Sequence, residues 1–262
     1  MSITEPTTQM NAGNLTQRQI YVVFAGVTAA MGLSALDGTI VTTALATIVG
    51  DLGGLKYYAW IGTSYMLTST VATPLFGKLS DLYGRRRLFQ IAILTFLLGS
   101  IICGVSQSMW QLVVARGIQG IGGGGLFSLS FAIIGDIVPP RERGRYVGLI
   151  TSVFTISSVI GPLIGGFIVD NTSWRWIFLV NLPVGIVALM ITNKSLKLPF
   201  TAMQQKVDYI GATLLVVAVS CLILGLSWTG GSYGWLSAPT IAFFAAALIV
   251  SIAFFRWESR AE

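Results

Sequence analysis

Residues 77–87 read Gly77-Lys78-Leu79-Ser80-Asp81-Leu82-Tyr83-Gly84-Arg85-Arg86-Arg87, with apolar stretches on both sides at residues 58–76 and 88–106. A helix that crosses a bilayer needs about 20 mostly apolar residues, so each flanking stretch is long enough for one span. The glycines permit a tight turn, and clustered cations hold a connection on the cytoplasmic side of a membrane. This part of the chain therefore predicts two membrane helices joined by a short cytoplasmic loop.

The same pattern extends along the whole chain. Hydrophobic residues make up 54% of the 262 residues and charged residues only 10%, whereas roughly a quarter of a soluble domain is charged. Stretches that are long and apolar enough to span a bilayer lie at residues 20–48, 58–76, 88–106, 110–134, 146–169, 174–193, 208–228 and 239–256. Helices are the expected form, because a helix satisfies its own backbone hydrogen bonds in lipid. The predicted fold is an all-α membrane protein with about eight transmembrane helices.

The lysines and arginines are distributed unevenly between the two sides of this predicted bundle. Thirteen of the 16 lie in the tails and loops of one side, whereas Lys56 and Arg175 lie on the other and Arg116 lies within a span. Cytoplasmic loops carry the excess of positive charge in membrane proteins. We therefore expect a multi-pass protein with both termini in the cytoplasm. The partner that surrounds it would be the lipid bilayer. The net charge of +6 does not indicate nucleic-acid binding, because the cations lie in short clusters between apolar stretches.

Polar intervals divide the chain into five parts. We expect a cytoplasmic N-terminal tail at residues 1–19, a six-helix unit at 20–193, a cytoplasmic linker at 194–207, two additional transmembrane helices at 208–256 and a cytoplasmic end at 257–262. The sequence contains no histidine, no spacing typical of metal ligands and no pairing of a nucleophile with a base. An enzyme is therefore not expected, and no metal site is predicted.

Asp37 and Arg116 are the ionisable residues that fall clearly within predicted spans. Such residues usually face the interior of a bundle and mark the path of an ion or substrate. At about 1.5 Å of rise per residue, both lie at a similar depth in the outer part of the membrane, so a direct or water-mediated pair is expected. A purely structural ion pair is the alternative. Asp37 is the candidate proton carrier because it is the one carboxylate well inside a span, and movement of Arg116 would load and unload its proton.

Four strings in this chain resemble motifs of one family of transporters. Residues 77–87 resemble the signature loop of the major facilitator superfamily, with Leu82 where that family often has a basic residue. The first-span motif of drug:proton antiporters is similar to Leu36-Asp37-Gly38-Thr39-Ile40-Val41. A fourth-span motif linked with proton coupling is similar to Arg116-Gly117-Ile118-Gln119-Gly120. The fifth-span motif of exporters is similar to Gly161-Pro162-Leu163-Ile164-Gly165-Gly166.

The resemblance implies a fold and a function. Residues 20–193 would form the N-terminal half-bundle of a major facilitator, and the last two spans would be the extra central helices of the fourteen-span antiporter branch. Such a protein exports small lipophilic or cationic compounds, drugs among them, from a bacterial cytoplasm by alternating access. Its energy source is the proton gradient across the cytoplasmic membrane, and no cofactor is expected.

The resemblance also assigns roles to residues of this chain. Asp37 and Arg116 would couple transport to protons. The predicted conformational switch comprises Gly77, Asp81, Gly84, Arg85, Arg86 and Arg143, and the antiporter motif comprises Gly161, Pro162, Gly165 and Gly166. Candidate substrate contacts are Tyr65, Gln119 and Phe127, for which ordinary core packing is the alternative explanation.

The superfamily pattern requires a second six-helix half, which this sequence does not supply. We therefore expect a truncated chain or a fragment, and the alternative to a working exporter is a transport-inactive half or membrane partner protein. The partner that would complete such a half is either a second half-transporter or another copy of this chain.

Overall fold

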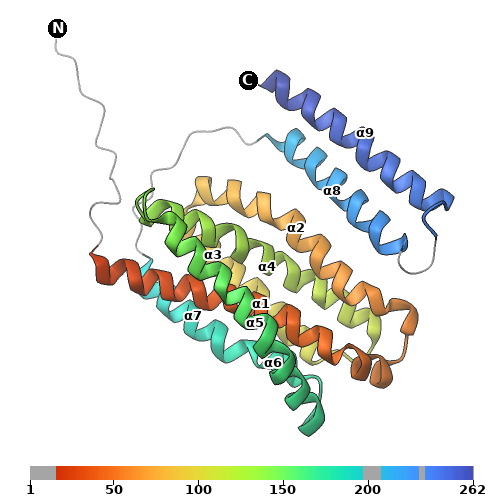
Figure 1. The fold of residues 1–262 in the computed structure, drawn as a ribbon, viewed down its shortest axis with the longest axis horizontal. Helices are drawn as coiled ribbons and strands as arrows, with labels where there is room; N and C mark the ends of the chain where they lie inside the picture. Colours follow the sequence, from red (N-terminus) through yellow and green to blue (C-terminus); the bar gives the residue numbers. More distant parts are fainter. Residues whose placement is uncertain (1–15, 197–207, 230–233, 262) are drawn as a thin grey trace.

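The structure is a computed structural model that describes residues 16–196, 208–229 and 234–261. Its helices are α1 (Gln17–Leu52), α2 (Tyr58–Tyr83), α3 (Arg85–Gly104), α4 (Met109–Ile137), α5 (Arg143–Asn171), α6 (Trp176–Leu179), α7 (Asn181–Ser195), α8 (Tyr209–Thr229) and α9 (Ala238–Ala261), with a 3-10 turn at Leu55–Tyr57 (Figure 1). No strand occurs in these residues, so the predicted all-α fold is confirmed.

The described part of the chain contains seven helices that are long and apolar enough to cross a membrane, with α6 and α7 together forming one of them. The expected span at residues 58–76 corresponds to α2, which is 26 residues long but falls outside that set because it is more polar. Hydroxyl side chains such as Thr68, Ser69 and Thr73 lie along it. This polarity is consistent with a helix that faces a cavity as well as lipid.

Buried apolar side chains form two clusters that meet on α1. One cluster takes α1 residues up to Leu33, together with Phe89 and Phe96 of α3. The other takes α1 residues from Ile40 onward, together with Phe178 of α6. Asp37 lies between the two clusters along the helix, so its carboxylate sits where the apolar core is interrupted.

The glycines of α4 allow this helix to lie directly against both of its neighbours. A Cβ atom at Gly122 would come within 2.7 Å of the Phe96 Cα on α3, and one at Gly124 would come within 2.9 Å of the Ser69 Cα on α2. Since no side chain fits at those distances, glycine is what permits the close approach. The glycines at residues 120–125 therefore serve close packing between helices.

The last two helices form a hairpin that packs on α2. Figure 1 shows α8 and α9 antiparallel to each other, beside α2 and away from α7. The hydroxyls of Thr63 on α2 and Ser227 on α8 are 2.8 Å apart. The expected N-terminal tail at 1–19 and linker at 194–207 lie mostly outside the described residues, and the expected division of the chain stays a prediction.

Candidate functional site: a buried ion pair beside a cavity

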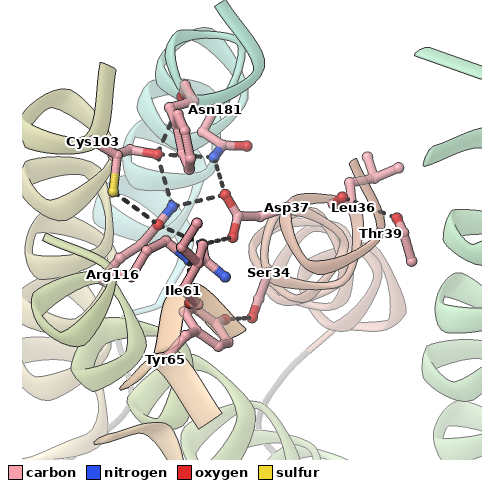
Figure 2. Close-up of polar contacts among 12 residues, drawn as sticks. Ser34, Leu36, Asp37, Thr39, Ile61, Tyr65, Cys103, Arg116 and Asn181 are labelled. Carbon is pink, nitrogen blue, oxygen red and sulfur yellow. Dashed lines mark hydrogen bonds and ion pairs between the residues drawn. The ribbon is translucent and has the colours of Figure 1, made fainter. Parts of the chain in front are cut away.

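The two charges predicted within the membrane form an ion pair. The Asp37 side chain on α1 is 0% exposed and Arg116 on α4 is 2% exposed. Nη1 of Arg116 lies 2.5 Å from Oδ2 of Asp37 (Figure 2). The pair expected from the similar depths of the two residues is therefore present, and both charges are shielded from solvent. Removing either charge would leave the other buried without a counterion.

Neutral side chains from two further positions complete the hydrogen bonding of the carboxylate, and a third, Ser100, bonds to both of them. Oδ1 of Asp37 accepts from Nε2 of Gln119 and from Nδ2 of Asn181, each at 2.8 Å. The same two amides also donate to Oγ of Ser100, at 2.9 and 2.8 Å. Nη1 of Arg116 is 2.7 Å from Oε1 of Gln119. Three hydrogen bonds therefore point at the oxygens of Asp37, one from Arg116 and one from each of the two amides.

Two members of this cluster were not identified as site residues from the sequence. Asn181 is the first residue of α7, and Pro183 two residues later lacks the amide hydrogen that would continue a helix through this point. That local interruption is the sequence signal that a helix begins at Asn181 within a predicted span, with a polar side chain at its start. Ser100 gives no such signal, because single serines are common in apolar helices. Whether its side chain points toward Asp37 or toward lipid depends on the packing of the bundle.

A cavity of about 640 Å³ lies beside the ion pair. Its lining combines hydroxyl and apolar side chains from α1, α2, α4, α5 and α8: Ser34, Ala35, Gly38, Tyr65, Ser69, Thr70, Val71, Thr73, Pro74, Gly123, Gly124, Phe127, Phe154, Leu215, Val216 and Val219. Two of the candidate substrate contacts, Tyr65 and Phe127, are in this lining. Gln119 is not: it is fully buried and bonded to Asp37 and Ser100, so we reassign it to the polar cluster.

Tyr65 is the residue that belongs to both the cavity and the ion-pair cluster. Its ring centroid lies 4.2 Å from the guanidinium carbon of Arg116, the geometry of a cation–π contact. Its hydroxyl lies 2.7 Å from the hydroxyl of Ser34 on α1 (Figure 2). The charged pair is therefore separated from the cavity by an aromatic ring that a hydrogen bond holds in place.

The predicted antiporter motif on α5 divides into two faces. A Cβ atom at Gly161 would come within 2.7 Å of Thr39 Cβ on α1, and one at Gly165 would come within 3.1 Å of the Ile40 carbonyl oxygen. Gly166 has open space around it, and Pro162 lies within a helix that continues to Asn171. Gly161 and Gly165 thus permit the close contact between α5 and α1, while Gly166 does not serve that contact.

The predicted switch loop is tied together by Arg85. Its guanidinium lies 2.6 Å from Asp81 on α2 and 3.0 Å from Asp136 on α4, and it also donates to Ser80 and, at 3.5 Å, to the Gly77 carbonyl oxygen. Gly84 joins α2 to α3 with φ 93°, a left-handed conformation that favours glycine. The loop between α2 and α3 is thus linked directly to the end of α4.

The two other cations of the predicted switch bind backbone and amide oxygens. Arg86 donates to the carbonyl and side-chain oxygens of Asn193 on α7, at 2.8 and 2.6 Å. Arg143 donates to the carbonyl oxygens of Gly135 and Val138 at the end of α4, at 2.6 and 3.1 Å. The connection from Asp81 to the end of α4 therefore runs through Arg85 and Asp136. Asp136 was missed because α4 extends beyond the predicted span, which ended at residue 134.

Replacing Asp136 with asparagine is expected to lower the stability of the chain only slightly. The two side chains of this pair are 21% and 44% exposed, and Arg85 keeps Asp81 as a partner, so the loss should be about 0.2–1 kcal/mol. Thermal unfolding in detergent measures it, with Glu142→Gln at the exposed start of α5 as the control. A loss as large as that of a buried pair would show that the contact is a principal support of the fold.

Comparisons with known proteins show which proteins share this architecture. The family model of the Major Facilitator Superfamily matches residues 27–255. The Bacillus subtilis multidrug resistance protein 3 is 42% identical over 97% of this chain and 49% of its own length. The multidrug transporter protein MdtP of the same organism is 41% identical over 92% of this chain and 44% of its own length. The chain thus spans about half the length of these curated relatives.

Solved structures show the same fold at low sequence identity. The proton:xylose symporter XylE aligns with a TM-score of 0.63 at 14% identity, over 90% of this chain and 54% of the symporter. A bacterial homologue of the human lysosomal transporter Spinster aligns with a TM-score of 0.63 at 16% identity, over 92% of this chain and 73% of the homologue. These likenesses confirm the predicted fold class. In the described residues, no group of three His, Cys, Asp or Glu side chains is placed to hold a metal ion.

Proposed function

The chain belongs to the Major Facilitator Superfamily, and we propose that it is a proton-coupled exporter of small lipophilic or cationic compounds that works by alternating access. The observation that carries this proposal is a fully buried carboxylate, Asp37, beside a cavity of about 640 Å³ with largely apolar walls. The multidrug names of the two Bacillus subtilis relatives support the proposed substrates. We place the protein in a bacterial cytoplasmic membrane with cytoplasmic termini, on the strength of its asymmetric lysine and arginine distribution.

The lining of the cavity favours lipophilic ligands. Phe127, Phe154 and Tyr65 offer aromatic faces, which attract organic cations as well as apolar groups. Hydroxyls such as those of Ser69 and Thr70 offer hydrogen bonds without fixing one geometry. Apolar walls with a few polar groups are typical of sites that bury small molecules.

The ion pair provides a physical route for coupling to protons. Protonation of Asp37 would neutralise the partner of Arg116 and leave a buried cation uncompensated, a state that is strongly unfavourable. Because Asp37 lies on α1 and Arg116 on α4, the two charges separate when those helices move relative to each other. Proton binding and helix movement would therefore accompany each other, as alternating access requires.

The cytoplasmic contacts supply a candidate for the conformational switch. Arg85 joins Asp81 to Asp136, and Arg86 joins α3 to Asn193 on α7. In our proposal these contacts hold one conformation and break in another. The antiporter-motif glycines Gly161 and Gly165 would keep α5 in contact with α1 while the pathway is closed.

The second candidate function is a transport-inactive half that needs a partner. It is favoured by the fact that the matched relatives are about twice as long as this chain. The partner would be a chain that supplies the second half-bundle or another copy of this chain.

Reconstituted vesicles distinguish these proposals. We expect the purified chain, alone or with a second half-bundle, to move tetraphenylphosphonium in response to an imposed pH gradient, and to stop when an ionophore collapses the gradient. Movement by the chain alone supports an exporter, and movement only with the added half supports the second candidate. Uptake that ignores the pH gradient in both preparations would contradict proton coupling.

A further inference from the structure

Tyr65 occupies a position that neither the ion pair nor the cavity explains alone. Its side chain forms part of the cavity lining, while its ring covers the guanidinium of Arg116 at 4.2 Å. A ligand in the cavity can therefore touch Tyr65 but cannot reach Asp37, which is 0% exposed. Any influence of the ligand on the ion pair has to pass through the residues that separate them.

The ring is fixed from three sides. Its hydroxyl is 2.7 Å from Ser34 on α1, its face rests on Arg116 of α4, and α4 leaves space for it at Gly123, where a Cβ atom would come within 2.9 Å of the phenol carbon Cζ. Ser34 lies three residues before Asp37, so both point from one face of α1. Figure 2 shows Tyr65 next to Ser34 and Arg116, on the opposite side of Asp37 from Asn181.

Displacement of this ring would change the energy of the ion pair. Arg116 would lose a desolvated cation–π contact if a ligand turned the ring away. The charged or titratable side chains that face Asp37 are Arg116 from α4, Tyr65 from α2 and Cys103 from α3. Among these, Tyr65 is the one that also lines the cavity.

We propose that Tyr65 is a positioning residue that transmits occupancy of the cavity to the Asp37–Arg116 pair. The proposal rests on the proposed proton coupling and specifies how a substrate acts on it. A bound compound competes with Ser34 and Arg116 for the phenol, the guanidinium loses its aromatic partner, and the balance between charged and protonated Asp37 shifts. Ser34 is the anchor that holds the ring in place until the compound arrives.

The test measures protons released or taken up per ligand bound. The purified full chain in detergent receives tetraphenylphosphonium in weakly buffered solution, with a pH indicator for protons and equilibrium dialysis for binding. Because protons are counted per ligand bound, a weaker affinity does not by itself alter the count, and Tyr65→Leu should lower the count at least about fivefold, the lower end of usual coupling between sites. Ser34→Ala and Tyr65→Phe each remove one end of the same hydrogen bond and keep the ring, so each should reduce the count by about two- to fivefold.

Ser152→Ala is the matched control, because it removes the same hydroxyl as Ser34→Ala from a position on α5 outside the cavity lining, where that hydroxyl bonds to the Leu149 carbonyl oxygen of its own helix. It should leave the proton count at the wild-type value. A wild-type chain that exchanges no protons on binding would contradict the proposed function and, with it, this inference. Wild-type counts in Tyr65→Leu, with normal exchange in the wild type, would overturn the role of Tyr65 alone. Should Tyr65→Leu fail to fold, wild-type counts in both Ser34→Ala and Tyr65→Phe would overturn it.

Discussion

Replacing Arg116 with glutamine should destabilise the chain by about 3–5 kcal/mol, because it leaves the Asp37 carboxylate buried without a counterion. Both side chains are almost completely shielded, at 3% and 0% exposure. Gln119 and Asn181 would remain as neutral donors to the carboxylate, and they cannot neutralise its charge. Unfolding of the purified protein in detergent gives the free energy, and the vesicle assay gives transport.

The reciprocal change, Asp37→Asn, should lower stability less than Arg116→Gln does, and it should abolish transport. Without Asp37, the guanidinium keeps the face of Tyr65 and the side-chain oxygen of Gln119. These contacts offset part of the cost of a buried cation. The side chain of asparagine does not ionise and cannot carry a proton, so movement driven by the pH gradient should be abolished.

The double variant Asp37→Asn with Arg116→Gln separates the two roles of the pair. It removes both charges, so stability should return to near the wild-type value, while gradient-driven transport stays absent. Arg175→Gln is the matched control, because its pair with Asp51 at 3.1 Å is 34% and 48% exposed, and it should cost at most about 1 kcal/mol. Transport by the double variant at the wild-type rate would show that the pair is structural only.

The depth of the ion pair was predictable from the sequence, whereas the places of Ser100 and Asn181 in its hydrogen-bond network were not. Counting residues at a fixed rise places Asp37 and Arg116 at one level. The sequence also contained an unused signal for Gln119, because it follows Arg116 by three residues and so shares its helix face. The contributions of Ser100 and Asn181 depend on how α3 and α7 are rotated within the bundle, and hydropathy carries no information on that rotation.

The extent of the helices illustrates a second limit of hydropathy. The first span was predicted at residues 20–48, but α1 runs from Gln17 to Leu52. The second was predicted at 58–76, but α2 continues to Tyr83. An apolar stretch marks the part of a helix that lies in hydrocarbon, whereas the helix itself continues into the polar interface. This is why Asp136, near the end of α4, was not assigned to the switch that it joins through Arg85.

Gly124→Ala should produce a large loss of stability, as should other single-methyl changes at the buried glycines of α4. The new Cβ atom would lie 2.8 Å from the Ser69 carbonyl carbon and 2.9 Å from its Cα. Backbone atoms cannot rotate away as a side chain can, so α2 and α4 must separate. Overpacking of this kind typically costs about 1–3 kcal/mol and occasionally more, and the upper end is expected because the clash lies in the middle of a helix pair.

Gly135→Ala is the control on the same helix, because no atom outside the adjoining backbone of α4 lies within 4 Å of the position its Cβ would take. Alanine is also the better helix former, so this variant should equal the wild type or gain up to about 1 kcal/mol. The two variants add the same methyl group to the same helix and differ only in what that group meets. Equal stability of the two would mean that α4 does not approach α2 as closely as the structure shows.

The same pair of variants tests whether the glycines of α4 also shape the cavity. Gly124, Ser69 and Thr73 all line it, so separating α2 from α4 should weaken binding of tetraphenylphosphonium as well as stability. Gly135 is absent from that lining, and its variant should bind the ligand normally. If Gly124→Ala loses stability while its binding of tetraphenylphosphonium stays at the wild-type level, the glycines serve helix packing and the cavity is set by other contacts.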